Sequence, residues 1–480
     1  MICSSKPQQL VAKNVWGQGH DLFSGVVGVC SVIDSLEIRR QPWRQPPKAV
    51  SVRMVLKKPA LVIHKRTAAV RAGPKCIDLF SGAGGLAVGF RKAGWSIVAA
   101  NDLDEDAAAT FRLNFPEATF FQGPIAALAA KDLLKECGLK PGELDCMIGG
   151  PPCQSFSHNN HQRSASDARA RLFEDYLRLV REVLPKTLVM ENVPGLLSID
   201  NGSVLREIKR RLEGLGYSAT ERVLSAEEFG TPQVRKRVFI VASRIGDGGE
   251  LLPPPTHKSA TRKSSKRRKN AATAKPLRLK SWVTVQDAIG DLPAIPNGGG
   301  TQKQRRLGVW KATSGYQREA RKGTRTIYNH VCHSLTKVNL DRIVHVPEGG
   351  NWRSIPRDLL TAGMKRAEAS AHTKRYGRLD RKGLASTLLT KCDPHWGAYV
   401  HPTQDRTISV REAARLQGFP DTFRFAGDWI GKHYEQVGNA VPVPVACAIG
   451  VAALAHLQTS ALQRRGKRIN TPKPQMLRAA

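Results

Sequence analysis

Short apolar runs alternate with helix-like segments between residues 75 and 245, and this alternation constrains the fold more than any other feature of the sequence. The first run covers residues 76–80, a glycine turn follows at residues 81–85, and residues 86–93 have helical periodicity. Strands that alternate with helices are typical of a parallel sheet with helices on its faces. The sequence therefore predicts an α/β fold for this part of the chain.

The glycine turn is suited to hold a nucleotide-like ligand. Gly82, Gly84 and Gly85 let the backbone approach a ligand closely, and the helix that follows offers free N–H groups at its N-terminus. The next predicted strand, residues 96–100, is soon followed by Asp102, and a carboxylate about 20 residues past such a turn suits bonding to ribose hydroxyls. A plain connector and a helix N-cap are the alternative interpretations of these two features.

A cysteine and a glutamate each follow a predicted strand. Residues 144–148 form an apolar run that stops at a glycine pair, and two prolines stiffen the approach to Cys153. Glu191 comes directly after the run at residues 187–190. Because open α/β sheets bind ligands at the carboxyl ends of their strands, we expect both side chains at one edge of the sheet. Cys153 is then a candidate nucleophile, with a small buried hydrophobe as the alternative.

Two further segments extend the pattern. Gln233, Arg235 and Arg237 alternate just before the apolar run at residues 238–242, so their side chains are expected on one face, with solvated cations as the alternative. Residues 436–442 predict a turn that opens an apolar helix at residues 443–457. Nothing near that helix in the sequence could cover it, so we expect it to pack onto the sheet domain.

The chain is strongly basic, with 75 Lys and Arg against 40 Asp and Glu and a formal net charge of +35. This balance indicates a polyanionic partner, most commonly nucleic acid, and an ordinary basic protein with charged tails is the alternative. Residues 257–280 contain ten Lys or Arg and no acidic residue, which fits either a tether or an arm on phosphates. The nine cysteines include no CxxC pair, so the sequence predicts reduced thiols and no metal site.

Taken in order, these segments resemble the DNA cytosine-5 methyltransferase family. The resemblance covers roughly residues 75–245 and 400–455 and rests on residues 78–85 (DLFSGAGG), 151–157 (PPCQSFS), 191–193 (ENV), Gln233 with Arg235 and Arg237, 411–420 (REAARLQGFP) and 438–442 (GNAVP). It implies a Rossmann-like S-adenosylmethionine-dependent methyltransferase domain with a smaller, irregular target-recognition domain. It also implies methyl transfer from S-adenosylmethionine to C5 of a flipped-out cytosine in a specific DNA sequence.

The resemblance assigns roles to individual residues. Cys153 would attack C6 of the cytosine, and Glu191 would donate to N3, which requires burial to raise the pKa of its carboxyl group. Arg235 and Arg237 would stabilise the developing charge. The residues that would bind the cofactor are Phe80, Gly82, Ala83, Gly85, Asp102, Leu103, Leu172 and Asn439. The sequence departs from the family at Pro124, where an aspartate usually holds the adenine amino group.

Composition and periodicity, together with the resemblance, predict a series of segments with different roles. They are a poorly ordered extension at 1–72, the catalytic domain at 73–250, a basic linker at 251–280, the target-recognition domain at 281–400, a segment that returns to the catalytic domain at 401–460, and a basic tail at 461–480. The expected partner is double-stranded DNA, and the expected setting is a restriction-modification system with a cognate endonuclease, or an orphan enzyme. A cytoplasmic, nucleoid-associated monomer without membrane contact is expected. A tRNA cytosine methyltransferase and a non-catalytic DNA-binding protein on the same fold are the alternatives.

Overall fold

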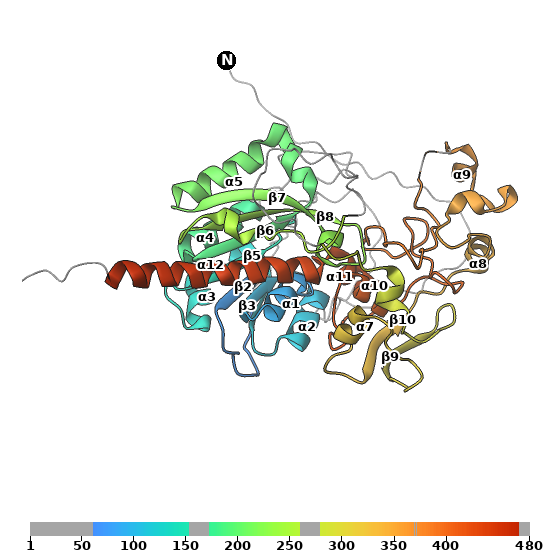
Figure 1. Cartoon of the computed structure of the whole chain (residues 1–480), viewed down its shortest axis with the longest axis horizontal. Helices are drawn as coiled ribbons and strands as arrows, with labels where there is room; N and C mark the ends of the chain where they lie inside the picture. Colours follow the sequence, from blue (N-terminus) through green and yellow to red (C-terminus); the bar gives the residue numbers. More distant parts are fainter. Residues whose placement is uncertain (1–60, 153–171, 260–278, 369, 371, 470–480) are drawn as a thin grey trace, which may run out of the picture. The chain divides into compact units, whose positions relative to one another are not determined.

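The computed structural model describes residues 61–152, 172–259, 279–368, 370 and 372–469 (Figure 1). All of these residues belong to one unit of the chain, residues 57–480. Cys153 and the rest of residues 153–171, most of the predicted linker and the tail after residue 469 lie outside the described residues.

An eight-stranded mixed sheet organises the first half of the chain, with the strand order β1-β4-β3-β2-β5-β6-β8-β7. Strands β4, β3, β2, β5 and β6 run parallel, whereas β1, β8 and β7 pair antiparallel with their neighbours. The strands are β1 (Val62–His64), β2 (Lys75–Leu79), β3 (Ser96–Asp102), β4 (Thr119–Gln122), β5 (Cys146–Gly149), β6 (Thr187–Asn192), β7 (Ser218–Ser225) and β8 (Lys236–Ser243). The predicted α/β fold class is confirmed.

Helices cover both faces of this sheet, because consecutive side chains of each strand point to opposite faces. Cys76 packs on the side of α1, α2 and α12, and Ile77 packs on the side of α3, α4 and α5 (Figure 1). These helices are α1 (Gly85–Lys92), α2 (Glu105–Asn114), α3 (Ala130–Cys137), α4 (Leu172–Val183), α5 (Ser203–Gly214) and α12 (Val443–Ile469). Short 3-10 helices connect several elements: η1 (Ile125–Ala127), η4 (Pro194–Gly202), η5 (Ala226–Phe229), η6 (Gly248–Leu251), η7 (Trp352–Ser354) and η8 (Arg357–Leu359).

The region for which the sequence shows weak periodicity contains only short elements. They are α6 (Val285–Ile289), β9 (Gly300–Arg305), α7 (Gly315–Ala320), β10 (Thr326–Val331), α8 (Lys337–Ile343) and α9 (Ala362–Arg366). Strands β9 and β10 pair antiparallel, and a separate small core forms around Ile343, Trp352 and Tyr376. Strand β1 was not expected, because it lies inside the segment to which the sequence analysis assigned little order.

The C-terminal helices return to the sheet domain. After α10 (Val410–Leu416) and α11 (Ile430–Asn439), helix α12 packs against α1, and the Trp95 indole N–H donates to the Gly450 carbonyl over 2.8 Å. The prediction that this apolar helix covers the sheet domain is confirmed. By length and composition alone, the part of α12 at Val443–Gln463 could cross a membrane, although 39% of its apolar stretch is buried inside the protein. The predicted turn at 436–442 was wrong in part, because residues 436–439 form the last turn of α11.

Candidate active site

The glycine turn lies between β2 and α1 and is held by the end of β3. The Gly82 N–H donates to a carboxylate oxygen of Asp102 over 2.7 Å, and the Ser81 N–H donates to the Asn101 carbonyl over 3.0 Å. Phe80 adopts a left-handed backbone conformation with φ of 54°, which is uncommon for a non-glycine residue. The turn is therefore a fixed structure, and β3 determines its position.

Two positions of the turn, Gly85 and Gly82, favour glycine for different structural reasons. A Cβ atom on Gly85 would lie 2.7 Å from the Val441 carbonyl oxygen, so only glycine allows the start of α1 to approach the segment before α12. Gly82 has φ of 52°, and a Cβ atom there would meet nothing within 4 Å. The open space beside Gly82 fits a ligand that approaches the backbone closely.

The remaining predicted cofactor residues lie around this turn. Asp102 also accepts a hydrogen bond from the Asp104 N–H over 2.9 Å, and burial raises the pKa of its carboxyl group. Leu103 follows Asp102 and is 62% exposed, which is unusual for a large apolar side chain and fits a ligand contact. Pro124 is the N-cap residue before η1 and follows β4, the strand next to β3, so the position where the family carries its aspartate lies at the same sheet edge.

The other members of the predicted set come from α1, α4 and α11. Ala83 is buried between Gly82 and α1. Leu172 is the first residue of α4 and, like Phe80, is partly buried against the hydrophobic core on the α3, α4 and α5 side of the sheet. Asn439 is exposed at the C-terminal end of α11. It directly precedes Ala440, whose Cβ atom would lie 3.1 Å from a Cβ atom on Gly85. The fold thus brings the end of α11 to the glycine turn.

Glu191 lies against the backbone that leads toward position 153. A Cβ atom on Gly150 would be 3.0 Å from Glu191 Oε2, and the Asn192 side-chain amide donates to the Pro151 carbonyl over 3.0 Å. The parallel pairing of β5 and β6 produces this arrangement, because both strands end at the same edge. Cys153, the predicted nucleophile, lies outside the described residues. Gly150 and Pro151, which precede Pro152, are held against Glu191 and Asn192.

Arg237 forms an ion pair with Glu191, with 2.8 Å between Arg237 Nε and Glu191 Oε1. Burial raises the pKa of the Glu191 carboxyl group above its ordinary value, and the positive charges of Arg237 and Arg235 oppose that rise without cancelling it. A carboxyl group with a raised pKa keeps its proton more readily near neutral pH and can donate a hydrogen bond. This direction agrees with the requirement that the family resemblance implies for Glu191.

Arg235 has a different environment from Arg237, although the family resemblance assigns both to the same chemistry. Its two terminal nitrogens donate to the carbonyls of Leu388 and Gly438, each over 2.8 Å, and the residue is 3% exposed. It precedes β8, in a segment that pairs with residues 385–388. The described contacts of Arg235 therefore position backbone near Glu191.

The sequence motifs include two buried side-chain amides, those of Gln233 and Gln417, to which no role was assigned. Gln233 donates to Gln417 Oε1 over 3.1 Å and accepts from the Leu388 N–H over 2.9 Å. Gln417 in turn donates to the carbonyls of Val437 and Ala440, over 2.8 Å and 3.3 Å. The motif at residues 411–420 includes Gln417, but its structural role becomes apparent only in the fold, which places α10 beside α11.

Asp78 was also missed as a separate feature. Its carboxyl oxygens are buried at the carboxyl half of β2, and neither has a hydrogen-bond partner among the described residues. Burial raises the pKa of this carboxyl group well above its ordinary value, and the neighbouring Asp102 adds to the rise. Asp78 therefore favours its protonated form in the folded protein.

Comparison with known proteins agrees with this geometry. Residues 74–454 match the family described as C-5 cytosine-specific DNA methylase. The type II methyltransferase M.AgeI of Thalassovita gelatinovora is 34% identical over 77% of this chain and 96% of its own length. The DNA (cytosine-5)-methyltransferase 1A of Oryza sativa subsp. japonica is 33% identical over 78% of this chain, which spans only 28% of that longer protein.

Among solved structures, the chain is similar to a prophage-encoded E. coli protein that was assigned as a DNA modification methyltransferase. The TM-score is 0.60 at 25% identity, and the match covers 80% of this chain and all of the other. This likeness supports the fold described above.

Proposed function

Since the chain belongs to the C-5 cytosine-specific DNA methylase family and is a DNA cytosine-5 methyltransferase, we propose that it methylates a flipped-out cytosine in double-stranded DNA through a covalent adduct with Cys153. The observation that carries this mechanism is the position of Glu191. Its carboxyl group has a raised pKa, pairs with Arg237 and lies against Gly150, three residues before the proposed nucleophile.

The chemistry requires these groups because C5 of cytosine is a poor nucleophile. When the thiolate of Cys153 forms a bond to C6, the electrons of the C5–C6 double bond make C5 enamine-like, and protonated Glu191 donates a hydrogen bond to N3. After C5 takes the methyl group, a base in the surrounding water removes the C5 proton, and the electron pair of the C5–H bond re-forms the C5–C6 double bond. The sulfur–carbon bond breaks in the same elimination, and the sulfur leaves with its electron pair as the thiolate of Cys153. Arg237 orients the Glu191 carboxyl group throughout.

The methyl donor proposed for this site is S-adenosylmethionine, which supplies an electrophilic methyl group when it is bound. The glycine turn fits such a group, because Gly82 has open space beside its backbone and Asp102 fixes the turn. The residues that would hold the donor are Phe80, Gly82, Ala83, Gly85, Asp102, Leu103, Leu172 and Asn439. Pro124 cannot supply the usual carboxylate, so a backbone carbonyl is proposed to accept from the adenine amino group.

The biological setting is proposed to be a restriction-modification system or that of an orphan enzyme. The match to nearly the whole length of M.AgeI supports this setting over that of the much longer eukaryotic relatives. The enzyme is proposed to act as a cytoplasmic, nucleoid-associated monomer, with a cognate restriction endonuclease only in the first case. Residues 281–400 are proposed to select the DNA sequence.

A transfer assay tests the mechanism directly. The purified protein is incubated with methyl-labelled S-adenosylmethionine and plasmid DNA, and bisulfite sequencing then identifies the methylated sites. We expect 5-methylcytosine in DNA and no label in tRNA. Cys153→Ser should abolish transfer, whereas Cys447→Ser, which changes a half-buried cysteine in α12, should retain it. A covalent complex with DNA that contains 5-fluorocytosine at the mapped site should survive denaturation, and its absence would contradict the mechanism.

A further inference from the structure

A buried polar ring joins helices α2 and α11 beside the proposed cofactor site. The Ala426 N–H donates to the Thr110 hydroxyl oxygen over 2.7 Å, and the Thr110 hydroxyl donates to Gln436 Oε1 over 2.6 Å. The Gln436 amide then donates to the Ala426 carbonyl over 2.8 Å, which closes the ring. Thr110 is fully buried and Gln436 is 6% exposed. Neither side chain has a role in the proposed chemistry.

The backbone of Ala426 determines how this ring is arranged. Its N–H can only donate and its carbonyl can only accept, so the Thr110 oxygen accepts, the single hydroxyl proton goes to Gln436, and the Gln436 amide nitrogen faces the carbonyl. Hydrogen bonds that follow one another in this way strengthen each other in a low-dielectric interior. Loss of one member would leave buried polar groups of the other two without partners, which is unfavourable.

Residues 424–426 run along one face of α2. Thr110 and Asn114 are four residues apart on that helix and therefore lie on the same face. The Asn114 side chain donates to the Arg424 carbonyl over 2.7 Å and accepts from the Arg424 N–H over 3.0 Å, as the backbone of a neighbouring strand would. The segment that carries Ala426 is thus held against α2 at two successive turns.

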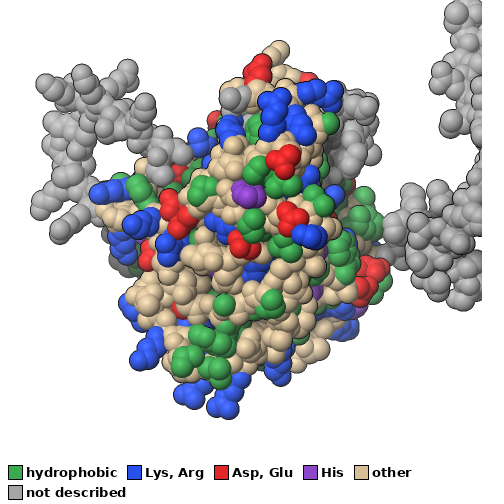
Figure 2. Space-filling view, turned by 90° about the vertical axis from the view of Figure 1, so that its right-hand side faces the viewer, with side chains coloured by type: hydrophobic (Ala, Val, Ile, Leu, Met, Phe, Trp, Pro, Cys, Tyr) green, Lys and Arg blue, Asp and Glu red, His purple; other side chains and the backbone are tan. Residues whose placement is uncertain are grey.

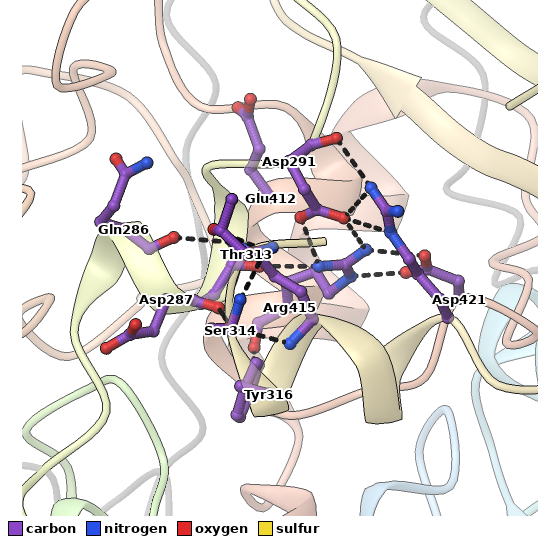
Figure 3. A network of polar contacts seen from close by, with 12 residues as sticks. Gln286, Asp287, Asp291, Thr313, Ser314, Tyr316, Glu412, Arg415 and Asp421 are labelled. Carbon is purple, nitrogen blue, oxygen red and sulfur yellow. Dashed lines mark hydrogen bonds and ion pairs between the residues drawn. The ribbon is translucent and has the colours of Figure 1, made fainter. Parts of the chain in front are cut away.

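A buried ion network fixes the chain just before this segment. Figure 3 shows Arg415 of α10 between two carboxylates, 2.6 Å from Asp421 and 3.1 Å from Asp291. Arg306 also contacts Asp421, and Arg321 contacts Asp291. The segment that follows Asp421 therefore starts from a fixed position and does not depend on α2 alone.

The ring lies between two parts of the proposed cofactor site. Thr110 belongs to α2, the helix that follows Asp102. Gln436 lies in the last turn of α11, three residues before Asn439, and its backbone carbonyl accepts from the Ala440 N–H over 3.2 Å. The side chain of Gln436 therefore ties the turn that carries Asn439 to the helix that follows Asp102.

Exposed ion pairs are weaker links than this ring. Lys, Arg, Asp and Glu side chains are interspersed on the face shown in Figure 2, where water and salt screen their charges. Between α2 and α11, Lys432 Nζ lies 3.6 Å from Asp104 Oδ2, but both side chains are only half-buried, and such a pair contributes little. The buried ring is therefore the stronger polar link between the two helices.

We propose that Thr110 and Gln436 are positioning residues of the methyl-donor site. The ring holds Asn439 at a fixed separation from Asp102, so S-adenosylmethionine enters a site that is already formed and less conformational entropy is lost on binding. The two residues act through the ends of α2 and α11 and do not touch the donor. This inference rests on the proposed function, because that function places the donor between Asp102 and Asn439.

The variant Thr110→Val tests this role, because valine keeps the shape of threonine and removes the hydroxyl group. It leaves the Ala426 N–H and Gln436 Oε1 without their partner, so we expect the dissociation constant for S-adenosylmethionine to rise about tenfold. Thr110→Ser keeps the hydroxyl group and should retain the affinity of the unaltered protein. Isothermal titration calorimetry with S-adenosylmethionine alone measures each constant without DNA or turnover.

The matched control is Thr187→Val, which makes the same change at the first residue of β6. Thr187 is fully buried, and its hydroxyl donates to the Asp145 carbonyl over 2.8 Å at the end of the strand opposite Glu191. Both valine variants should lower the free energy of unfolding in urea, but only Thr110→Val should weaken donor binding. A purely structural role would lower stability in both variants and leave donor binding intact in both.

A double-mutant cycle tests whether the ring acts as one unit. Gln436→Met removes the amide with little change in size and should weaken donor binding about as much as Thr110→Val. Because each change alone breaks the ring, the double variant should bind the donor about as weakly as either single variant. Additive losses would show two independent contacts and would overturn the proposal.

The outcomes separate this inference from the proposed function. Unaltered donor affinity in Thr110→Val, or an equal loss in Thr110→Ser or Thr187→Val, would overturn the inference even if methyl transfer to DNA is intact. If the unaltered protein binds the donor but transfers no methyl group, the proposed mechanism fails, while the calorimetric comparison still decides the role of Thr110. If the unaltered protein does not bind S-adenosylmethionine, both the inference and the donor assignment fail.

Discussion

The substitution Asp421→Asn tests whether the buried ion network stabilises the region around α10. Asp421 is fully buried and accepts from Arg415 over 2.6 Å and 2.7 Å. Arg306 and the buried Arg411 also lie close enough for their charges to lower the pKa of the Asp421 carboxyl group. Asparagine has nearly the same shape, so the substitution removes the charge with little change in packing.

The structure sets the size of the effect. Without the Asp421 charge, Asp291 alone would face the guanidinium groups of Arg306, Arg321 and Arg415. Loss of one partner from a buried ion pair leaves an uncompensated charge and costs about 3–5 kcal/mol. The asparagine amide would also present N–H groups toward a guanidinium donor. We therefore expect a loss of about 3–5 kcal/mol in the free energy of unfolding near neutral pH.

Equilibrium urea unfolding, followed by tryptophan fluorescence, measures this loss. The matched control is Asp341→Asn, which makes the same chemical change in the exposed ion pair with Lys337 and should cost less than about 1 kcal/mol. Because the pKa of Asp421 is lowered, its contribution is present above the carboxyl group's ordinary pKa and is lost as the pH falls through the folded value. Equal effects of the two substitutions would refute the assigned role of the network.

Three further substitutions test individual titrating groups. Glu191→Gln should lower kcat/KM by about 10²–10⁴-fold. It should also remove the decline in rate that is expected as pH rises through the raised pKa of Glu191, and a variant whose pH profile keeps this decline would exclude Glu191 as the acid. Asp78→Asn should raise the free energy of unfolding in urea above pH 7, because a carboxyl group whose pKa is raised by folding destabilises the folded state as pH rises. The wild-type protein loses about 1.4 kcal/mol for each pH unit over which only the folded state holds the proton. A variant that is less stable than the wild type at that pH would contradict this. Burial lowers the pKa of His401 to about 4, so the protein should lose about 3 kcal/mol between pH 6.5 and 4, and unfolding curves of His401→Gln that keep the full loss would show another origin.

Local periodicity predicted the sheet domain well because its elements are determined largely within their own segments. Residues 105–114 follow the N-cap residue Asp104 and begin with Glu105 and Asp106, local features that favour the start of a helix, and they form α2. The helical periodicity at residues 86–93 agrees with α1 to within one residue at each end. Strand β1 could not be predicted, since it has only three residues and pairs with β4, which lies 58 residues further along the chain.

Some features of the candidate site and its surroundings could likewise be predicted from the sequence, and others could not. The pairing of Glu191 with Arg237 follows from two strands that are neighbours in the sheet, and the sequence motifs indicate both residues. The roles of Asp291 and Asp421 could not be inferred, because each depends on an arginine whose position is known only after folding. Residues 153–171 lie outside the described residues, so the placement of Cys153 stays a prediction.

The Arg235 side chain connects segments that lie far apart in the sequence and carry separate motifs. Its guanidinium group joins the Leu388 carbonyl to the Gly438 carbonyl, next to Asn439 at the glycine turn. Leu388 and Gly438 lie 153 and 203 residues further along the chain, so no local pattern could reveal this junction. Because the same charge also acts on the Glu191 carboxyl group, one side chain links the geometry beside the glycine turn, the proposed cofactor site, to the electrostatics of Glu191, the proposed base-binding residue. Its loss would therefore affect both sides, which separates Arg235 from Arg237 even though the two alternate on the same short segment.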